Sequence, residues 1–141
     1  CGGWNQDLRR VPDFEYWLRV SKLGHFHRVD TTTGQYRVHE DSTAIRPIPP
    51  ARSAEIAETM HRYWAGKEQL PSARKALSIA HLKAAQSHAQ SGRPFSAISE
   101  FAHSVRFRPR TAISRSAWRA LISSFLLRYV SRHGWLSARL R

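Results

Sequence analysis

Cysteine is nearly absent from this sequence, since Cys1 is the only one among 141 residues. No internal disulfide can form, which fits a reducing compartment. Long hydrophobic runs are absent as well, because no apolar stretch approaches the roughly 20 residues that a membrane-spanning helix needs. We therefore expect a cytoplasmic protein, whose contact with the cell membrane would be peripheral and at its inner face.

Acidic residues are scarce in most of the chain, and none follows Glu100. Residues 1–45 hold six Lys/Arg and six Asp/Glu, so the whole net charge of +13 lies in residues 46–141. A positive field of this size attracts phosphate-rich partners such as an anionic membrane surface, nucleic acid or a nucleotide diphosphate. The hydrophobic content of 41% and the five tryptophans favour a folded chain over a disordered one.

The signatures of several enzyme and metal-binding classes are also missing. The sequence contains no P-loop, no Gly-x-Ser-x-Gly and no His-Glu-x-x-His motif. Its eight histidines do not predict a zinc site. Neither the pair His25 and His27 nor the pair His81 and His88 has the cysteine or carboxylate partners of a zinc signature.

The first third of the chain instead contains several short motifs. Gly2-Gly3 permits backbone conformations that other residues resist, which by itself predicts only a turn. Pro12 and Asp13 predict a helix start, because proline is tolerated in the first turn and an acid there complements the helix dipole. On this ground alone Asp13 is a helix cap.

The same helix carries one apolar face. Phe14, Trp17 and Leu18 have the spacing i, i+3, i+4 of a helix that packs on a core. Gly24 is expected to end the helix as its C′ residue. Trp17 is therefore predicted to be a core residue rather than a ligand contact.

Two short strands are predicted after this helix, at residues 25–30 and 35–39, around a threonine-rich turn. Alternation along the second strand places Arg37 and His39 on one face. These two side chains can share a polar cleft, or they can lie on the solvated face of an edge strand. The pattern alone does not choose between the two arrangements.

Taken in order, these motifs resemble the C-terminal part of the catalytic domain of family 2 glycosyltransferases. That family runs Gly-Gly-(Phe/Trp)-(Asp/Asn), then Glu-Asp-(Tyr/Phe)-x-x-Trp-x-Arg, then Tyr-Arg-x-His-x-x-Ser. The matching residues are Gly2, Gly3, Trp4, Asn5, Asp13, Phe14, Trp17, Arg19, Tyr36, Arg37, His39 and Ser42. Pro12 stands where the family has Glu, and the sequence lacks the Asp-x-Asp metal motif of the family's nucleotide-binding half. We therefore expect that half to precede Cys1 in a longer natural chain.

The resemblance implies a reaction and a site. It implies transfer of a sugar, with inversion, from a sugar nucleotide to a hydroxyl of a glycan or lipid-linked acceptor, with Asp13 as the catalytic base. By resemblance, Gly2, Gly3 and Trp4 border the acceptor, Arg37 and His39 face the diphosphate, and His39 binds a divalent cation, Mg²⁺ or Mn²⁺. The remnant of the catalytic domain would span residues 1–45.

Composition changes after residue 45. Residues 46–50, Arg-Pro-Ile-Pro-Pro, predict an extended linker. Residues 51–141 predict a basic helical region. Its helices are expected to end at Gly66, to run from Pro71 to Ser91-Gly92, to run from Pro94 to before Pro109, and to run from about Ser114 to Ser131. Their expected apolar stripes are Ala57, Met60 and Trp64; Ala73, Ala76, Leu77, Ala80 and Ala84; and Ile98, Phe101, Ala102 and Val105.

Residues 81–109 resemble part of one tetratricopeptide unit. Gly92, Ala97, Phe101 and Pro109 fit its spacing, whereas the positions of its first helix do not. A single unit forms no solenoid, because repeats need neighbours, so we expect a helical hairpin. The expected fold class is α+β and mostly α-helical: the C-terminal remnant of an A-type α/β glycosyltransferase domain, followed by a tetratricopeptide-like helical tail.

The last predicted helix combines an apolar face with several arginines. Its apolar residues are Trp118, Leu121, Ile122, Phe125 and Tyr129, and its basic residues are Arg115, Arg119, Arg128 and Arg132. It can pack on its neighbours with solvated arginines, or it can lie in the interface of an anionic membrane. The alternative function for the chain is a basic helical module that binds nucleic acid, a membrane surface or a protein partner. For a glycosyltransferase, nucleic acid is not an expected partner.

Overall fold

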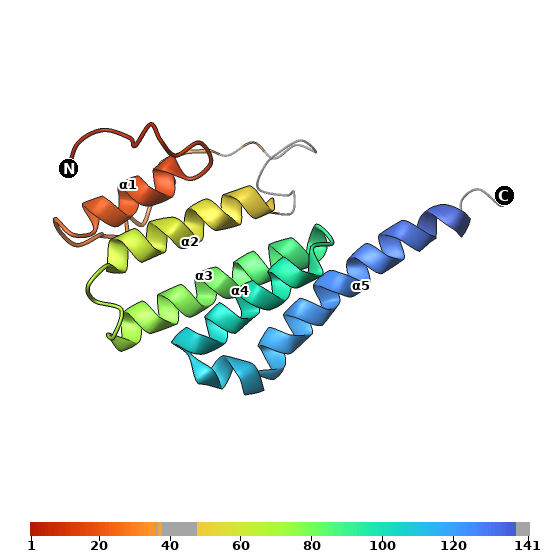
Figure 1. Ribbon diagram of the computed structural model, residues 1–141. Coiled ribbons are helices and arrows are strands. Elements are labelled where there is room, and N and C mark those ends of the chain that lie inside the picture. Colours follow the sequence, from red (N-terminus) through yellow and green to blue (C-terminus); the bar gives the residue numbers. More distant parts are fainter. Residues whose placement is uncertain (36, 38–47, 138–141) are drawn as a thin grey trace. The chain divides into compact units, whose positions relative to one another are not determined.

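The computed structural model describes residues 1–35, 37 and 48–137. Within these residues it contains five α-helices and one 3₁₀ helix, and no β-strand (Figure 1). The prediction of a mostly α-helical chain is therefore confirmed. The chain divides into two compact units, Cys1–Pro47 and Ile48–Arg141.

Unit Cys1–Pro47 contains one helix, α1 (Pro12–Val20), which begins at the predicted proline. It ends at Val20 rather than beside Gly24, so the prediction of Gly24 as the C′ residue is wrong. The Ser21 N–H donates to the Trp17 carbonyl at 2.9 Å, and the Leu23 N–H donates to the Val20 carbonyl at 2.9 Å. These turn bonds satisfy carbonyl groups at the helix end without a left-handed glycine.

The apolar face predicted for α1 is not buried. No α1 residue is buried, and Trp17 is 56% exposed, so the prediction of Trp17 as a core residue is wrong. Among residues 1–35 and 37 of this unit, the buried apolar residues are Leu8 and Val11, which precede the helix. Trp17 instead makes edge-on ring contacts with Tyr16 and Phe26, at centroid distances of 5.5 and 5.9 Å.

The first predicted strand is also wrong. Residues 25–30 form no strand, and an exposed ion pair of 3.0 Å joins Arg28 and Asp30 on this segment. Alternation alone does not make a strand, because a strand needs a partner to receive its ladder hydrogen bonds. Within the second predicted strand, Gln35 and Arg37 are not in a strand, and the other residues lie outside the described part of the chain.

Unit Ile48–Arg141 is built from helices that lie side by side (Figure 1). They are α2 (Pro50–Trp64), α3 (Pro71–Gln90), α4 (Pro94–Phe107), the 3₁₀ helix η1 (Pro109–Ile113) and α5 (Arg115–Ser137). Of the predicted linker, Ile48 and Pro49 are non-helical and Pro50 is the first residue of α2. Helix α3 contacts α2, α4 and α5, and is therefore the central element of this unit.

Glycines separate these helices as predicted. Gly66 and Gly92 have φ values of +75° and +68°, the left-handed region that favours glycine. After α3, the Arg93 N–H donates to the His88 carbonyl at 2.9 Å and closes the turn. Helices α3 and α4 therefore form the predicted helical hairpin.

Small side chains dominate the core of this unit. One buried cluster joins α3, α4 and α5 through Ala85, Ala89, Ala97, Phe101, Ala117 and Leu121. The predicted α3 stripe is largely buried, but the α4 stripe is rotated: Ile98 is 60% exposed, whereas Ala97 and Ser104 are fully buried. Alanine and serine face α3 because small residues let two helices approach closely, which leaves the bulkier Ile98 outside.

Helix α5 packs on α3 along one face. Ala117, Leu121 and Ser124 are buried, whereas Trp118, Ile122 and Leu126 are exposed. The predicted apolar face of this helix is thus only partly covered. Among the described residues, no helix is both long enough and apolar enough to cross a membrane.

Candidate functional site

Arg19 joins the motif residues at the start of the chain. Its Nη1 donates to the Cys1 carbonyl, and its Nη2 donates to the Gly3 carbonyl at 2.6 Å. Its Nε donates to Glu15 Oε1 at 2.7 Å, one helical turn earlier on α1. A single guanidinium therefore fastens the glycine loop to the helix that carries Asp13.

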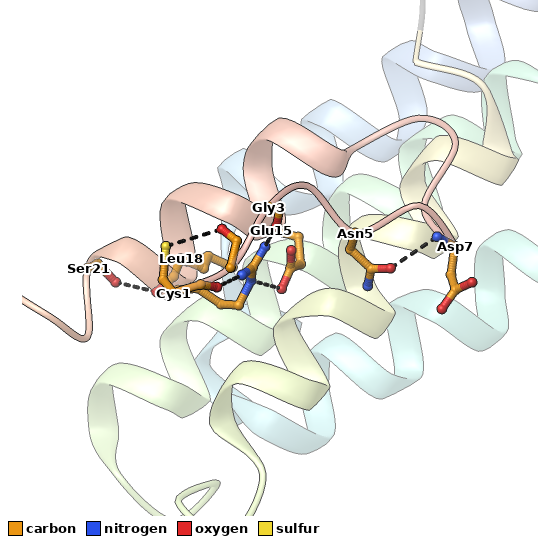
Figure 2. A network of polar contacts seen from close by, with 9 residues as sticks. Cys1, Gly3, Asn5, Asp7, Glu15, Leu18 and Ser21 are labelled. Atoms are coloured by element: carbon orange, nitrogen blue, oxygen red, sulfur yellow. Dashed lines mark hydrogen bonds and ion pairs between the residues drawn. The ribbon is translucent and has the colours of Figure 1, made fainter.

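The glycine loop adopts a conformation that suits this attachment. Gly2 has a φ of +74°, and a Cβ placed there would lie 3.6 Å from Arg19 Nη1. Asn5 continues the loop with its Oδ1, which accepts a hydrogen bond from the Asp7 N–H at 3.0 Å (Figure 2). The predicted Gly2-Gly3 turn thus has its left-handed φ angle at Gly2, where glycine adopts it at little cost.

Trp4 is brought next to helix α1. Its ring stacks on Tyr16 with a centroid distance of 6.2 Å and an interplanar angle of 17°, while 60% of Trp4 remains exposed. Arg19 also lies over the Tyr16 ring, with its Cζ 5.6 Å from the centroid. Tyr16 follows Asp13 by three residues, so the two lie on the same side of the helix. The half-buried Tyr16 therefore lies beside the candidate base, and the exposed Trp4 ring stacks on it.

Asp13 itself lies in the first turn of α1 and is exposed. Its Oδ1 accepts a hydrogen bond of 2.8 Å from the Phe14 N–H. The carboxylate thus satisfies one orphan N–H of the helix start while facing solvent, where a substrate hydroxyl can reach it. The capping geometry and the catalytic hypothesis are compatible.

The structure provides less information on the remaining predicted site residues, Arg37 and His39. Arg37 is exposed, and His39 lies outside the described residues. Glu15 and Tyr16 were not predicted as site residues, although Glu15 binds the motif residue Arg19 and Tyr16 stacks on the predicted site residue Trp4. The i, i+4 spacing of Glu15 and Arg19 was the sequence signal that could have identified the first of them.

A second polar cluster lies in the helical unit, on α2, α3 and α4. His81 Nδ1 is 2.7 Å from Glu100 Oε2, and His81 Nε2 is 2.9 Å from His61 Nε2. Because a carboxylate only accepts, Nδ1 carries the proton that is donated to Glu100. In neutral His81, Nε2 then accepts a hydrogen bond from His61.

Two further rings complete this cluster. His103 lies 5.1 Å from the His81 ring centroid, and Phe107 stacks on His81 at 5.6 Å with an angle of 10°. One donor atom each of His81, Glu100 and His103 lies within 4.8 Å of the others, which makes them a potential metal-ligand set. This set was not predicted from the sequence. The Glu100-x-x-His103 spacing on one helix was the signal that could have found it.

The cluster shifts two pKa values. Burial, and then the positive charge that His81 and His103 can carry, lower the pKa of His61 below 6.5, although Glu68 and Glu100 act in the opposite direction. The hydrogen bond from His81 lowers the pKa of Glu100, although partial burial alone would raise it.

Acidification should therefore destabilise the helical unit. Below about pH 6.5 for His61, and below about pH 4.5 for Glu100, the folded state binds fewer protons than the unfolded state. The free energy of unfolding should fall as the pH is lowered through these ranges. Denaturant titrations between pH 8 and pH 4, in buffers with a chelator, measure it. Glu100→Gln should make the free energy of unfolding less dependent on pH below pH 5. An unchanged pH dependence in this variant would show that the Glu100 carboxylate does not cause it.

Comparison with protein-family models gave no match to this chain, and neither did comparison with curated protein sequences or solved structures.

Proposed function

We propose that residues 1–45 are the C-terminal part of the catalytic domain of a family 2 glycosyltransferase. The observation that supports this best is the position of Arg19. It belongs to the Asp-Phe-x-x-Trp-x-Arg segment, and it binds the carbonyl of Gly3 in the Gly-Gly-Trp segment. The first two motif segments, which are separate in the sequence, thus meet in space at α1.

In the proposed reaction, Asp13 acts on the acceptor. Its carboxylate accepts the proton of the acceptor hydroxyl while that oxygen attacks the anomeric carbon of the donor sugar. The bond between the sugar and the diphosphate breaks, and the nucleoside diphosphate leaves with the bonding electrons. The exposed Trp4 ring, stacked on the half-buried Tyr16 beside the base, offers an aromatic surface against which an acceptor can lie. The proposed acceptor-binding residues are Gly2, Gly3 and Trp4.

In this proposal, residues 36–42 contribute to binding of the sugar-nucleotide donor. Arg37 and His39 would face the diphosphate, where positive charge stabilises the leaving group. The resemblance also implies Mg²⁺ or Mn²⁺ at His39. The described residues of unit Cys1–Pro47 hold no group of three potential protein ligands, so we assign no step to a cation here.

The proposal is tested by two measurements. The 141 residues alone should transfer no sugar from common sugar nucleotides, because they contain no Asp-x-Asp motif. The reading frame upstream of Cys1 should encode a β-α-β pattern with that motif. A start codon directly upstream of Cys1 would contradict the proposal, whereas transfer by the purified 141-residue chain would contradict the requirement for a preceding nucleotide-binding half.

A basic binding module is the second candidate function, and one feature of the helical unit favours it. Four basic residues line a recess beside Phe107: Arg74, Lys75, Arg108 and Arg110. Arg74 Nε donates to the Phe107 carbonyl at 2.8 Å, which holds one of these charges in place. Such a recess suits an anionic group of a partner. Further helical repeats encoded upstream of Cys1 would favour this function.

A further inference from the structure

The proposed glycosyl transfer does not use the histidine cluster of unit Ile48–Arg141. His81 comes from the middle of α3, and Glu100 and His103 come from α4. Hydroxyl groups hold these two helices together close to the cluster. Ser104 Oγ donates to the Ser78 carbonyl at 2.8 Å and lies 3.0 Å from Ser78 Oγ. The three side chains are therefore presented by a fixed pair of helices.

The residue types and their spacing suit a metal ion. Glu100 and His103 lie three residues apart, so they share one face of α4. Helical bundles use this Glu-x-x-His spacing to present two metal ligands from one helix. His81 supplies a third ligand from the facing helix. Two imidazole nitrogens and one carboxylate oxygen suit Zn²⁺ and similar transition metals, whereas Mg²⁺ and Ca²⁺ prefer ligand sets made of oxygen.

We propose that His81, Glu100 and His103 bind a divalent transition-metal ion, with Zn²⁺ as the representative, and leave a fourth coordination position open.

The distances allow this with small movements. The donor atoms of the three residues lie within 4.8 Å of one another. Ligand atoms around tetrahedral zinc, with bonds of about 2.0–2.1 Å, lie roughly 3.3 Å apart. His81 Nδ1 and Glu100 Oε2 are now 2.7 Å apart and share a proton. With the ion on Nδ1, neutral His81 adopts its other tautomer, with the proton on Nε2 instead of Nδ1, and the two ligand atoms separate by about half an ångström.

Groups around His81 fix its orientation. Its opposite nitrogen, Nε2, lies 2.9 Å from His61 Nε2, and Phe107 stacks on the face of the ring. With the metal on Nδ1, the Nε2–H donates to His61, which is the outer hydrogen bond that metal-bound histidines usually make. His61 is thus a positioning residue.

The site is also accessible. His81 is buried, Glu100 is partly buried and His103 is exposed, so the ligand set runs from the helix interface to the surface. An ion can enter from solvent on the His103 side. Three protein ligands with one open position are typical of zinc sites that bind a water molecule or a substrate.

Zinc titration of the whole chain, followed by calorimetry, tests the proposal. We expect one Zn²⁺ per chain, and a melting temperature that rises by about 5–10 °C at a zinc concentration of 100 times the Kd. Co²⁺ should give the visible absorption of a tetrahedral site. His103→Ala and Glu100→Gln should each weaken binding by more than about 100-fold, and His61→Ala by about 10–100-fold.

Controls separate this site from adventitious binding. The double variant His25→Ala, His27→Ala removes two exposed histidines of the other unit and should bind zinc as the wild type does. Because His103 is exposed, His103→Ala should fold even if Glu100→Gln does not, and circular dichroism checks this. The absence of stoichiometric binding by the wild type, or wild-type affinity in His103→Ala, would overturn the proposal.

Discussion

Replacing Asp13 with asparagine in the complete enzyme should lower glycosyl transfer by about 100-fold or more while leaving the fold intact. The loss follows from the proposed role, because an amide cannot take the proton of the acceptor hydroxyl. The fold should survive for a different reason. Asp13 accepts a hydrogen bond from the Phe14 N–H, and an asparagine side-chain oxygen can accept the same bond.

The experiment pairs turnover with thermal melting in wild type and Asp13→Asn. Asp7→Asn is the matched control, because it removes an exposed acid of the same unit that has no proposed catalytic role. Donor affinity should be unchanged in Asp13→Asn, whereas His39→Ala should weaken donor binding. If Asp13→Asn melts normally and keeps most of its turnover, Asp13 is only a helix cap and the proposed site is wrong.

Replacing Leu77 with alanine should lower the free energy of unfolding of the helical unit by about 2–5 kcal/mol. Leu77 is fully buried and, among the residues of its unit whose burial the structure describes, is the largest side chain with essentially no exposure. It lies on α3, the helix that contacts α2, α4 and α5. Truncation therefore leaves a cavity at the centre of the unit, where neighbouring alanines are too short to fill it.

Ile79→Ala is the matched control for this prediction. Ile79 lies two residues further along α3 and is 46% exposed, so its truncation opens no cavity. Its effect should stay within about 0.5 kcal/mol, because it is a surface substitution. Denaturant unfolding followed by circular dichroism measures both variants. A loss below about 1 kcal/mol for Leu77→Ala would show that α3 is not the central packing element.

The bounds of most helices could be predicted from the sequence, because their signals are local. A proline at the first position of a helix lacks only an N–H that would have no helical partner there. This is why Pro12, Pro71 and Pro94 begin α1, α3 and α4. Gly66 and Gly92 end α2 and α3 because the left-handed backbone conformation costs glycine little.

Other predictions failed because their outcome depends on neighbours. The alternating residues 25–30 form no strand, since alternation supplies no partner for the ladder hydrogen bonds. Spacing showed that α4 is amphipathic but did not show which residues face α3. The close approach of the two helices buries Ala97 and Ser104 and leaves Ile98 exposed.

For the two candidate sites as well, the sequence predicted what depends on local order, and packing decided the rest. The sequence by itself identified Asp13, the Gly-Gly-Trp segment and Arg19 as motif residues, because a motif is defined by the order of residues along the chain. Only the tertiary structure showed that Arg19 binds the Gly3 carbonyl, and that His61, His81 and Glu100 form one hydrogen-bonded chain. These three residues come from α2, α3 and α4. Packing between helices determines which side chains meet, and the spacing of residues along the sequence does not specify that packing.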